Sequence, residues 1–156
     1  MLSVFIGFGG PKAEEVAKEL ERFLNDEKIE NFLASPLSNA ILANESDFSA
    51  EINKKLLTYD ITVFVCHKDT HRNDQVRKEI NLLYRKHLES KIIPFSACDH
   101  CLPRRLKGKH WHPLHFAPEK AMESFPRLLN RIYRSYFELI PKPTGRVTET
   151  DPMVRQ

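Results

Sequence analysis

A run of six residues in the middle of the chain, Ile61 to Cys66, restricts the possible folds more than any other part of the sequence. It reads Ile-Thr-Val-Phe-Val-Cys, so it is rich in β-branched side chains and shows no alternation of apolar and polar positions. Such a pattern is typical of a strand that is covered on both faces. A polar loop follows, and a helical pattern then begins at Gln75, after Asn73 and Asp74, either of which can cap it. The apolar face of that helix consists of Val76, Ile80 and Leu83.

Strand and helix patterns alternate along the whole chain. Five strands are predicted: Leu2–Phe8, Ile29–Ala34, Ile61–Cys66, Lys91–Phe95 and Trp111–Phe116. The other predicted helices run from Pro11 to about Asn25, from Ser49 to Leu57, and from near Pro118 onward. This alternation predicts an α/β fold with a parallel sheet and helices on both faces, and five strands favour the flavodoxin-like order 2-1-3-4-5. We expect one domain over residues 1–138 and a flexible tail over residues 139–156, which are rich in Pro, Thr and charged residues.

Composition narrows the classes of function. The chain has 156 residues, of which 41% are hydrophobic and 29% charged, as in an ordinary globular domain. The net charge of +3 is too small to argue for nucleic-acid binding. No segment approaches the roughly 20 apolar residues of a membrane span, and no secretion signal is recognisable. Three cysteines make an odd count without a disulfide framework, so we expect a cytoplasmic protein.

In the predicted strand order the first and third strands are neighbours, so the loops that leave them flank one crevice. The first loop contains four candidate ligand-binding residues: Gly7, Phe8, Gly9 and Gly10. Glycines there allow a phosphate or a ribose to approach the backbone, although the pattern is neither GxGxxG nor a P-loop and also suits a simple turn. In the second loop, His71 and Arg72 can donate to a ligand phosphate or be solvated.

Glu79 lies beside Ile80, at the flank of the apolar helix face, so we expect its carboxylate at the rim of the core above the central strand. An arbitrary glutamate on a helix is usually solvated, but the position of Glu79 at the switch point of the sheet favours a functional role. Most glycosidases need two carboxylates because the leaving oxygen must be protonated. A pyridinium leaving group departs as a neutral molecule, so one carboxylate that orients the ribose hydroxyls and stabilises an oxocarbenium ion can suffice.

A second loop region has the residue types that bind zinc: Cys98, His100, Cys101, His110, His112 and His115. Their spacing matches no common zinc template, so we predict free thiols and no bound metal. The basic run nearby consists of Arg104, Arg105, Lys107 and Lys109. Such a run is usually a solvated loop, and it can also contact phosphates or an acidic partner.

Several segments together resemble the TIR (Toll/interleukin-1 receptor) domain family over roughly residues 1–137. They are Val4–Ile6, the helix from Val16 to Leu24, the strand from Ile61 to Val65, the run Val76-Arg77-Lys78-Glu79-Ile80, and Ile92-Ile93-Pro94. The resemblance implies a flavodoxin-like fold and, as in many family members, cleavage of NAD at the nicotinamide–ribose bond to give ADP-ribose or a cyclic product.

The resemblance also implies roles for single residues. Glu79 stands at the position of the family's catalytic glutamate, and Gln75 stands where the family often has an aromatic residue. Asp47 and Phe48 stand at the family's pattern before the second helix, and residues 35–48 match its gating loop. We therefore add Asp47, Phe48 and Gln75 to the candidate NAD-contacting residues.

Three functions remain as hypotheses. The first is a TIR-like enzyme that consumes NAD as a substrate, without a bound cofactor, in immune or defence signalling. The second is a non-catalytic TIR-like module that binds nucleotides or proteins through self-association. The third is an enzyme similar to nucleoside deoxyribosyltransferases, in which Glu79 would be a nucleophile. Expected partners are NAD, further copies of the chain, and a separate effector protein, with no nucleic acid and no membrane.

Overall fold

The computed structural model describes residues 1–35, 45–108 and 112–139, with side chains for all of these except residues 45–47. Five strands form one sheet: β1 (Ser3–Gly9), β2 (Glu30–Leu33), β3 (Ile61–Cys66), β4 (Ile92–Ser96) and β5 (Leu114–His115). All neighbouring pairs are parallel, and the order is β2-β1-β3-β4-β5. The predicted α/β flavodoxin-like architecture is therefore confirmed.

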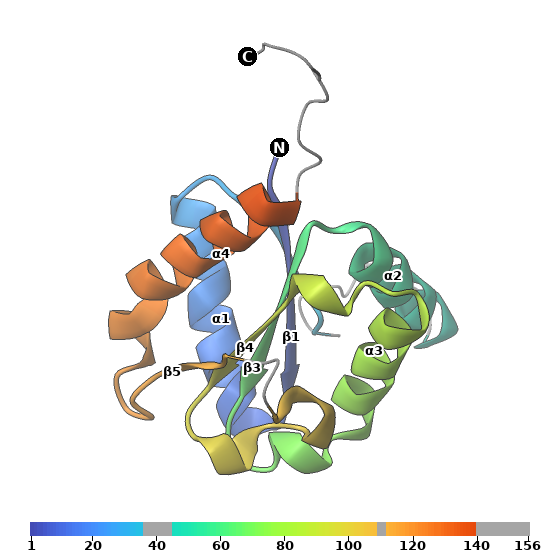
Figure 1. Ribbon diagram of the computed structural model, residues 1–156. Coiled ribbons are helices and arrows are strands. Elements are labelled where there is room, and N and C mark those ends of the chain that lie inside the picture. Colours follow the sequence, from blue (N-terminus) through green and yellow to red (C-terminus); the bar gives the residue numbers. More distant parts are fainter. Residues whose placement is uncertain (36–44, 109–111, 140–156) are drawn as a thin grey trace.

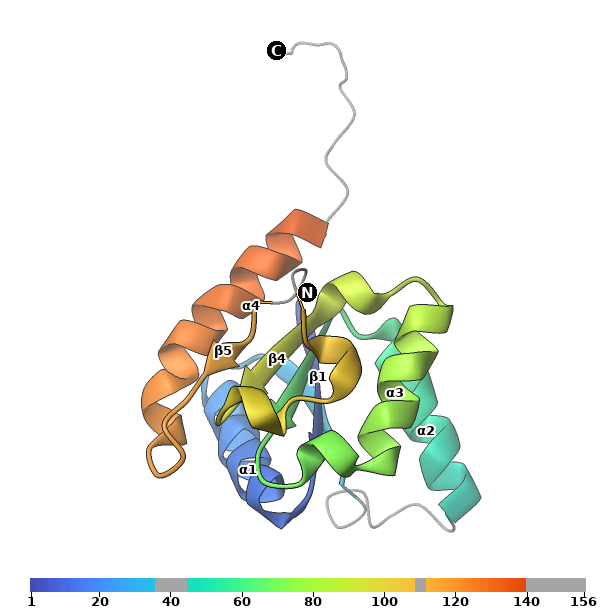
Figure 2. The same ribbon diagram turned by 60° about the horizontal axis from the view of Figure 1, so that its bottom comes forward.

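Helices cover both faces of the sheet, as Figures 1 and 2 show. On one side lie α1 (Pro11–Asp26) and α4 (Phe125–Leu139), and on the other lie α2 (Glu45–Thr58) and α3 (Asp74–Arg85). The central strand β3 is buried along its whole length, and its side chains pack against the helices on both faces of the sheet. Val63 and Val65 pack into the α1/α4 core, while Phe64 packs into the α2/α3 core. The period-two alternation of a strand thus explains why the apolar run needs no polar face.

Short sequence signals fix the start of the two helices next to the candidate site. Pro11 occupies the first turn of α1, where its missing N–H costs nothing, and five buried residues face the sheet: Ala13, Val16, Ala17, Leu20 and Leu24. Helix α3 starts after Asn73, whose side-chain Oδ1 accepts a 3.0 Å hydrogen bond from the backbone N–H of Val76. Both helices begin at the edge of the sheet where β1 and β3 end.

The boundaries of the described elements differ from prediction by more than one residue in three places. Helix α2 begins at Glu45, four residues before the expected Ser49, and part of the expected gating loop, residues 36–44, lies outside the described residues. Strand β5 has only two residues, because it pairs with β4 solely at Phe95 and Ser96. A 3-10 turn (Ala121–Ser124) precedes α4, which begins seven residues after Pro118.

Helix α4 ends at Leu139, next to the predicted domain boundary at residue 138, and the predicted tail beyond it lies outside the described residues. Within the described ranges, no helix combines the length and the apolar character that a transmembrane segment requires.

Candidate functional site

The carboxyl ends of β1 and β3 lie side by side, at the edge of the sheet where the sequence predicts a ligand site. The register pairs Gly7 with Phe64 and Gly9 with Cys66. The loop after β3 contains a 3-10 turn, η1 (Thr70–Arg72), that contacts β1. Because the strands are parallel neighbours, the glycine turn and the loop before α3 form one corner of the fold.

Thr70 joins the two loops at this corner. Its Oγ1 donates a 2.5 Å hydrogen bond to the carbonyl oxygen of Gly9 and accepts a 2.9 Å bond from the backbone N–H of His67. The side chain is 1% exposed, so these bonds satisfy a buried hydroxyl. Sequence reasoning missed Thr70, because the contact spans 61 positions and leaves no local pattern. The one local signal that could have pointed to this contact is a hydroxyl residue three positions before Asn73, the cap of α3.

The glycines of the turn allow close packing rather than an open cradle. A Cβ on Gly9 would lie 2.7 Å from the Cβ of Asn73, the capping residue of α3. A Cβ on Gly7 would lie 2.7 Å from the ring of Phe64 and 3.1 Å from Oε1 of Glu79. Since a larger residue at either position requires a shift of these neighbours, Gly7 and Gly9 let the start of α3 and the carboxylate of Glu79 approach the backbone of β1.

The prediction that Glu79 lies at the rim of the core is wrong. The residue is buried, with 2% of its surface exposed. The physical reason is that Gly7 has no side chain, so α3 and β1 close on each other around the carboxylate. Oε2 accepts a 3.0 Å hydrogen bond from Nε2 of Gln75, one helical turn earlier. Gln75 itself is exposed, so this bond connects the buried carboxylate to the molecular surface.

The environment of Glu79 strongly disfavours its charged form. Burial raises the pKa of its carboxyl from 4.5 to about 7, and the hydrogen bond from Gln75 only partly opposes that rise. No basic side chain within the described residues forms an ion pair with it. The group therefore titrates near neutral pH, which is a common property of functional carboxyls.

His71 and Arg72 are engaged with neighbours other than Glu79. The ring of His71 lies 4.8 Å from the ring of His100, and a guanidinium nitrogen of Arg72 lies 3.5 Å from a carboxylate oxygen of Asp69. The Arg72–Asp69 pair is exposed, so it contributes little stability. These residues are near the corner in sequence, but none of their contacts reaches the carboxylate.

The remaining candidate residues are divided between the two faces of the sheet. Phe8 packs against the α1/α4 core, on the face opposite to Gly7 and Glu79, whereas Phe48 packs against the α2/α3 core. Gly10 has a φ of 98°, which suits the turn into α1. The side chain of Asp47 lies outside the described residues.

Among the described residues, two surface pockets lie near the corner, and Glu79 is in the lining of neither. One of about 370 Å³ lies between α1 and the turn before α4, and Lys12, Glu15, His67 and Lys120 contribute to its lining. The other, of about 510 Å³, lies beside α3, and three arginines contribute to its lining: Arg77, Arg104 and Arg105. Arg105 also stacks over the ring of Tyr84, with 4.7 Å between its guanidinium carbon and the ring centre. The predicted basic run is thus partly held against α3.

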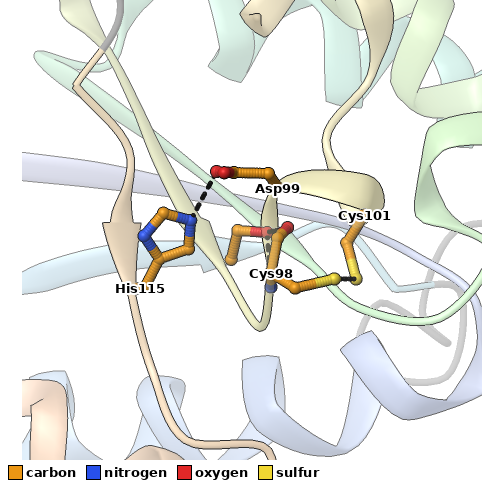
Figure 3. A network of polar contacts seen from close by, with 5 residues as sticks. Cys98, Asp99, Cys101 and His115 are labelled. Atoms are coloured by element: carbon orange, nitrogen blue, oxygen red, sulfur yellow. Dashed lines mark hydrogen bonds and ion pairs between the residues drawn. The ribbon is translucent and has the colours of Figure 1, made fainter.

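Three of the candidate zinc ligands, Cys98, Cys101 and His115, take part in two separate contacts (Figure 3). Sγ of Cys98 lies 3.0 Å from Sγ of Cys101, while Nε2 of His115 lies 2.9 Å from Oδ1 of Asp99. Within residues 1–35, 45–108 and 112–139, no group of three or more potential ligands is arranged to hold a metal ion. His110 is outside the described residues. The metal-free state stays a prediction.

Comparisons with known proteins give a match in structure but not in sequence. No protein-family model matches the chain, and a search of curated proteins found no match. The fold is similar to that in "Crystal Structure of a prokaryotic SEFIR domain", with a TM-score of 0.66 and 20% sequence identity, over 92% of this chain and 97% of that chain. At that identity the likeness shows the fold alone, which is the flavodoxin-like α/β fold described above.

Proposed function

We propose that this protein cleaves NAD at the bond between nicotinamide and ribose, with Glu79 as the residue that stabilises the ribosyl cation. The observation that carries the proposal is a buried carboxylate without a cationic partner among the described residues, at the corner between β1 and β3. Open α/β sheets bind ligands at this kind of corner.

The energetic cost of Glu79 favours a functional role over a structural one. A carboxyl whose pKa rises from 4.5 to about 7 on folding destabilises the folded state by about 3 kcal/mol once the group is ionised. A glutamine of the same shape would keep the packing without this cost. Such a costly group is expected where chemistry requires it.

The chemistry fits a single carboxylate. When the bond to ribose breaks, nicotinamide leaves as a neutral molecule and takes the bonding electron pair, so no acid has to protonate it. Positive charge then develops on the ribosyl ring. An anion held in a partly dry site stabilises that charge much more strongly than water does, because few dipoles have to reorganise. The ionised form of Glu79 is therefore the active form.

Access to the carboxylate depends on Gln75. Glu79 is 2% exposed, and the side-chain amide of Gln75, which lies toward the surface, donates a hydrogen bond to Oε2 of Glu79. A substrate ribose that hydrogen-bonds to the carboxylate must replace this amide. Gln75 is an exposed side chain on the first turn of α3, so its departure breaks one hydrogen bond and little packing.

A second candidate function is a non-catalytic module that associates with further copies of the chain. The observation that favours it is a pair of exposed aromatic side chains near the end of α4, Tyr133 and Phe137. Phe137 is 67% exposed and its ring stacks on Tyr133 with 6.3 Å between ring centres. Clustered aromatic residues are enriched in protein interfaces. The structural likeness to a prokaryotic SEFIR domain is compatible with this candidate.

One experiment separates the two candidates. Purified full-length protein is incubated with NAD over a range of protein concentrations, and free nicotinamide and oligomeric mass are both measured. If the protein is the proposed enzyme, nicotinamide is released, Glu79→Gln abolishes the release, and Glu79→Asp lowers it by a smaller factor than Glu79→Gln does. If the protein is the non-catalytic module, no nicotinamide is released at any protein concentration. The oligomeric mass then rises with protein concentration, and Phe137→Ala lowers it.

A further inference from the structure

Two thiols with different surroundings lie next to each other after β4. The 3-10 turn η3 (Asp99–Cys101) folds the chain back, and the backbone N–H of Cys101 donates a 3.1 Å hydrogen bond to the carbonyl oxygen of Cys98. This turn brings the two Sγ atoms within 3.0 Å, and Figure 3 shows the side chains pointing toward each other. Cys98 is exposed, whereas Cys101 is 7% exposed and belongs to the α2/α3 core.

We propose that Cys98 and Cys101 form a reversible dithiol–disulfide site, in which exposed Cys98 attacks a low-molecular-weight disulfide and buried Cys101 resolves the product. The proposal rests on the Sγ–Sγ contact, on the C-x-x-C spacing and on the contrast in exposure. It is independent of NAD cleavage, because it concerns another loop and is measured without NAD.

The two thiols differ in acidity in the direction that these roles require. The hydrogen bond from Cys101 lowers the pKa of Cys98, because it stabilises the thiolate. Burial raises the pKa of Cys101 and keeps it a thiol until a partner is attached to Cys98. An accessible thiolate beside a protected thiol is the arrangement that dithiol exchange needs.

The exchange is balanced in two steps. First, the Cys98 thiolate bonds to one sulfur of the small disulfide, and the other half leaves as a thiolate that takes up a proton. Second, Cys101 loses its proton and attacks Sγ of Cys98, and the second half leaves as a thiol. In total the protein loses two protons and two electrons, and the small disulfide takes them up to become two thiols.

The neighbouring polar pair does not take part. Asp99 points away from the thiols and toward His115, so neither side chain is directed at the sulfur atoms (Figure 3). The third cysteine, Cys66, is fully buried at the end of β3, where its Sγ lies 3.6 Å from the carbonyl oxygen of Phe64. Cys66 therefore serves as a matched internal control.

The test equilibrates reduced full-length protein in buffers of glutathione and glutathione disulfide, followed by acid quench, alkylation and tryptic peptide mass measurement. Cys98 and Cys101 fall on one peptide, residues 92–104, while Cys66 falls on another. The expected result is a peptide two hydrogens lighter that resists alkylation and is restored by excess glutathione. Cys66→Ala should leave the reaction unchanged.

The single variants test the assigned roles. Cys101→Ser should accumulate a glutathione adduct on Cys98, and Cys98→Ser should form no adduct on Cys101 at a comparable rate. In the reduced protein, Cys98 should be alkylated about 10-fold faster than Cys101 near neutral pH. The proposal is overturned if the peptide stays reduced in every buffer, if the glutathione adduct persists in wild-type protein, or if Cys66 is the residue that becomes oxidised.

Discussion

Nε2 of Gln75 donates a 3.0 Å hydrogen bond to Oε2 of Glu79, and this bond is the polar contact that links the buried carboxylate to an exposed side chain. The two residues are four positions apart on α3, so they lie one above the other on the same helix face. The amide stabilises the ionised carboxylate only partly, since burial still raises its pKa to about 7. Predictions for stability and for activity follow from this position.

The first prediction concerns stability. The pKa of Glu79 is raised on folding from 4.5 to about 7, so both states are protonated at low pH and the group then has no effect. As the pH rises through this interval, the unfolded chain releases its proton first and stability is lost, and above about pH 7 the loss is complete. Glu79→Gln has no such group. Urea unfolding should therefore show the variant about 3 kcal/mol more stable than wild type near pH 8 and about equal near pH 4.

The control for this measurement is Glu51→Gln, at a half-buried position on α2 where the carboxylate lies 3.5 Å from Nζ of Lys55. It should change stability by less than about 1 kcal/mol at any pH. A stability difference between wild type and Glu79→Gln that does not vary with pH would contradict the buried position of the carboxylate.

The second prediction concerns the pH dependence of activity. In the proposed function the ionised carboxylate of Glu79 is the active form, so kcat/KM for NAD cleavage should rise with pH and level off, with an inflection near 7. Initial rates of nicotinamide release between about pH 5 and pH 9 measure this. An activity that falls as Glu79 ionises would mean that the protonated acid is the active form and that the assigned role is wrong.

The third prediction concerns the close approach at Gly7. An added methyl group meets the Phe64 ring at 2.7 Å and Oε1 of Glu79 at 3.1 Å. Gly7→Ala should lower the free energy of unfolding by about 1–3 kcal/mol, because a packed core has to shift. The same substitution in a Phe64→Val background should cost less, since the ring is gone. Equal costs in both backgrounds, measured by urea unfolding, would show that the ring is not the obstacle.

The fourth prediction concerns the cap of α3. Asn73→Ala removes the acceptor for the Val76 N–H and should cost about 1 kcal/mol of stability. Asn73→Asp keeps a capping oxygen and should cost much less, which makes it the matched control. Thermal or urea unfolding distinguishes the two variants. If both cost the same, the packing of Asn73 against Gly9 matters more than the cap.

Strand order and helix layers were predictable because the local patterns agree with the global fold. The apolar run Ile61–Cys66 is buried on both faces, and the face of Val76, Ile80 and Leu83 packs where its period places it. The short strand Leu114–His115 and the start of α2 at Glu45 were predicted less well. Their limits depend on tertiary pairing rather than on a local repeat.

The candidate site was predictable in its position but not in its surroundings. Topology alone brings Gly7 and Glu79 to one corner. The burial of Glu79 depends on how closely α3 approaches β1, which in turn depends on two glycines and on a bond from Thr70 to Gly9. These are contacts between distant parts of the chain, and a helical wheel that puts Glu79 beside Ile80 cannot distinguish a rim position from a buried one.

The central claim is that Glu79 acts in catalysis although it destabilises the fold. The most direct measurement compares nicotinamide release from NAD by wild-type protein and by Glu79→Gln, at equal concentration and about pH 8, where wild-type Glu79 is mostly ionised. We predict release by wild type and a rate at least about 100-fold lower for the variant, whose fold is intact and more stable. A wild type that releases no nicotinamide at any protein concentration, or a variant that matches its rate, would contradict the account.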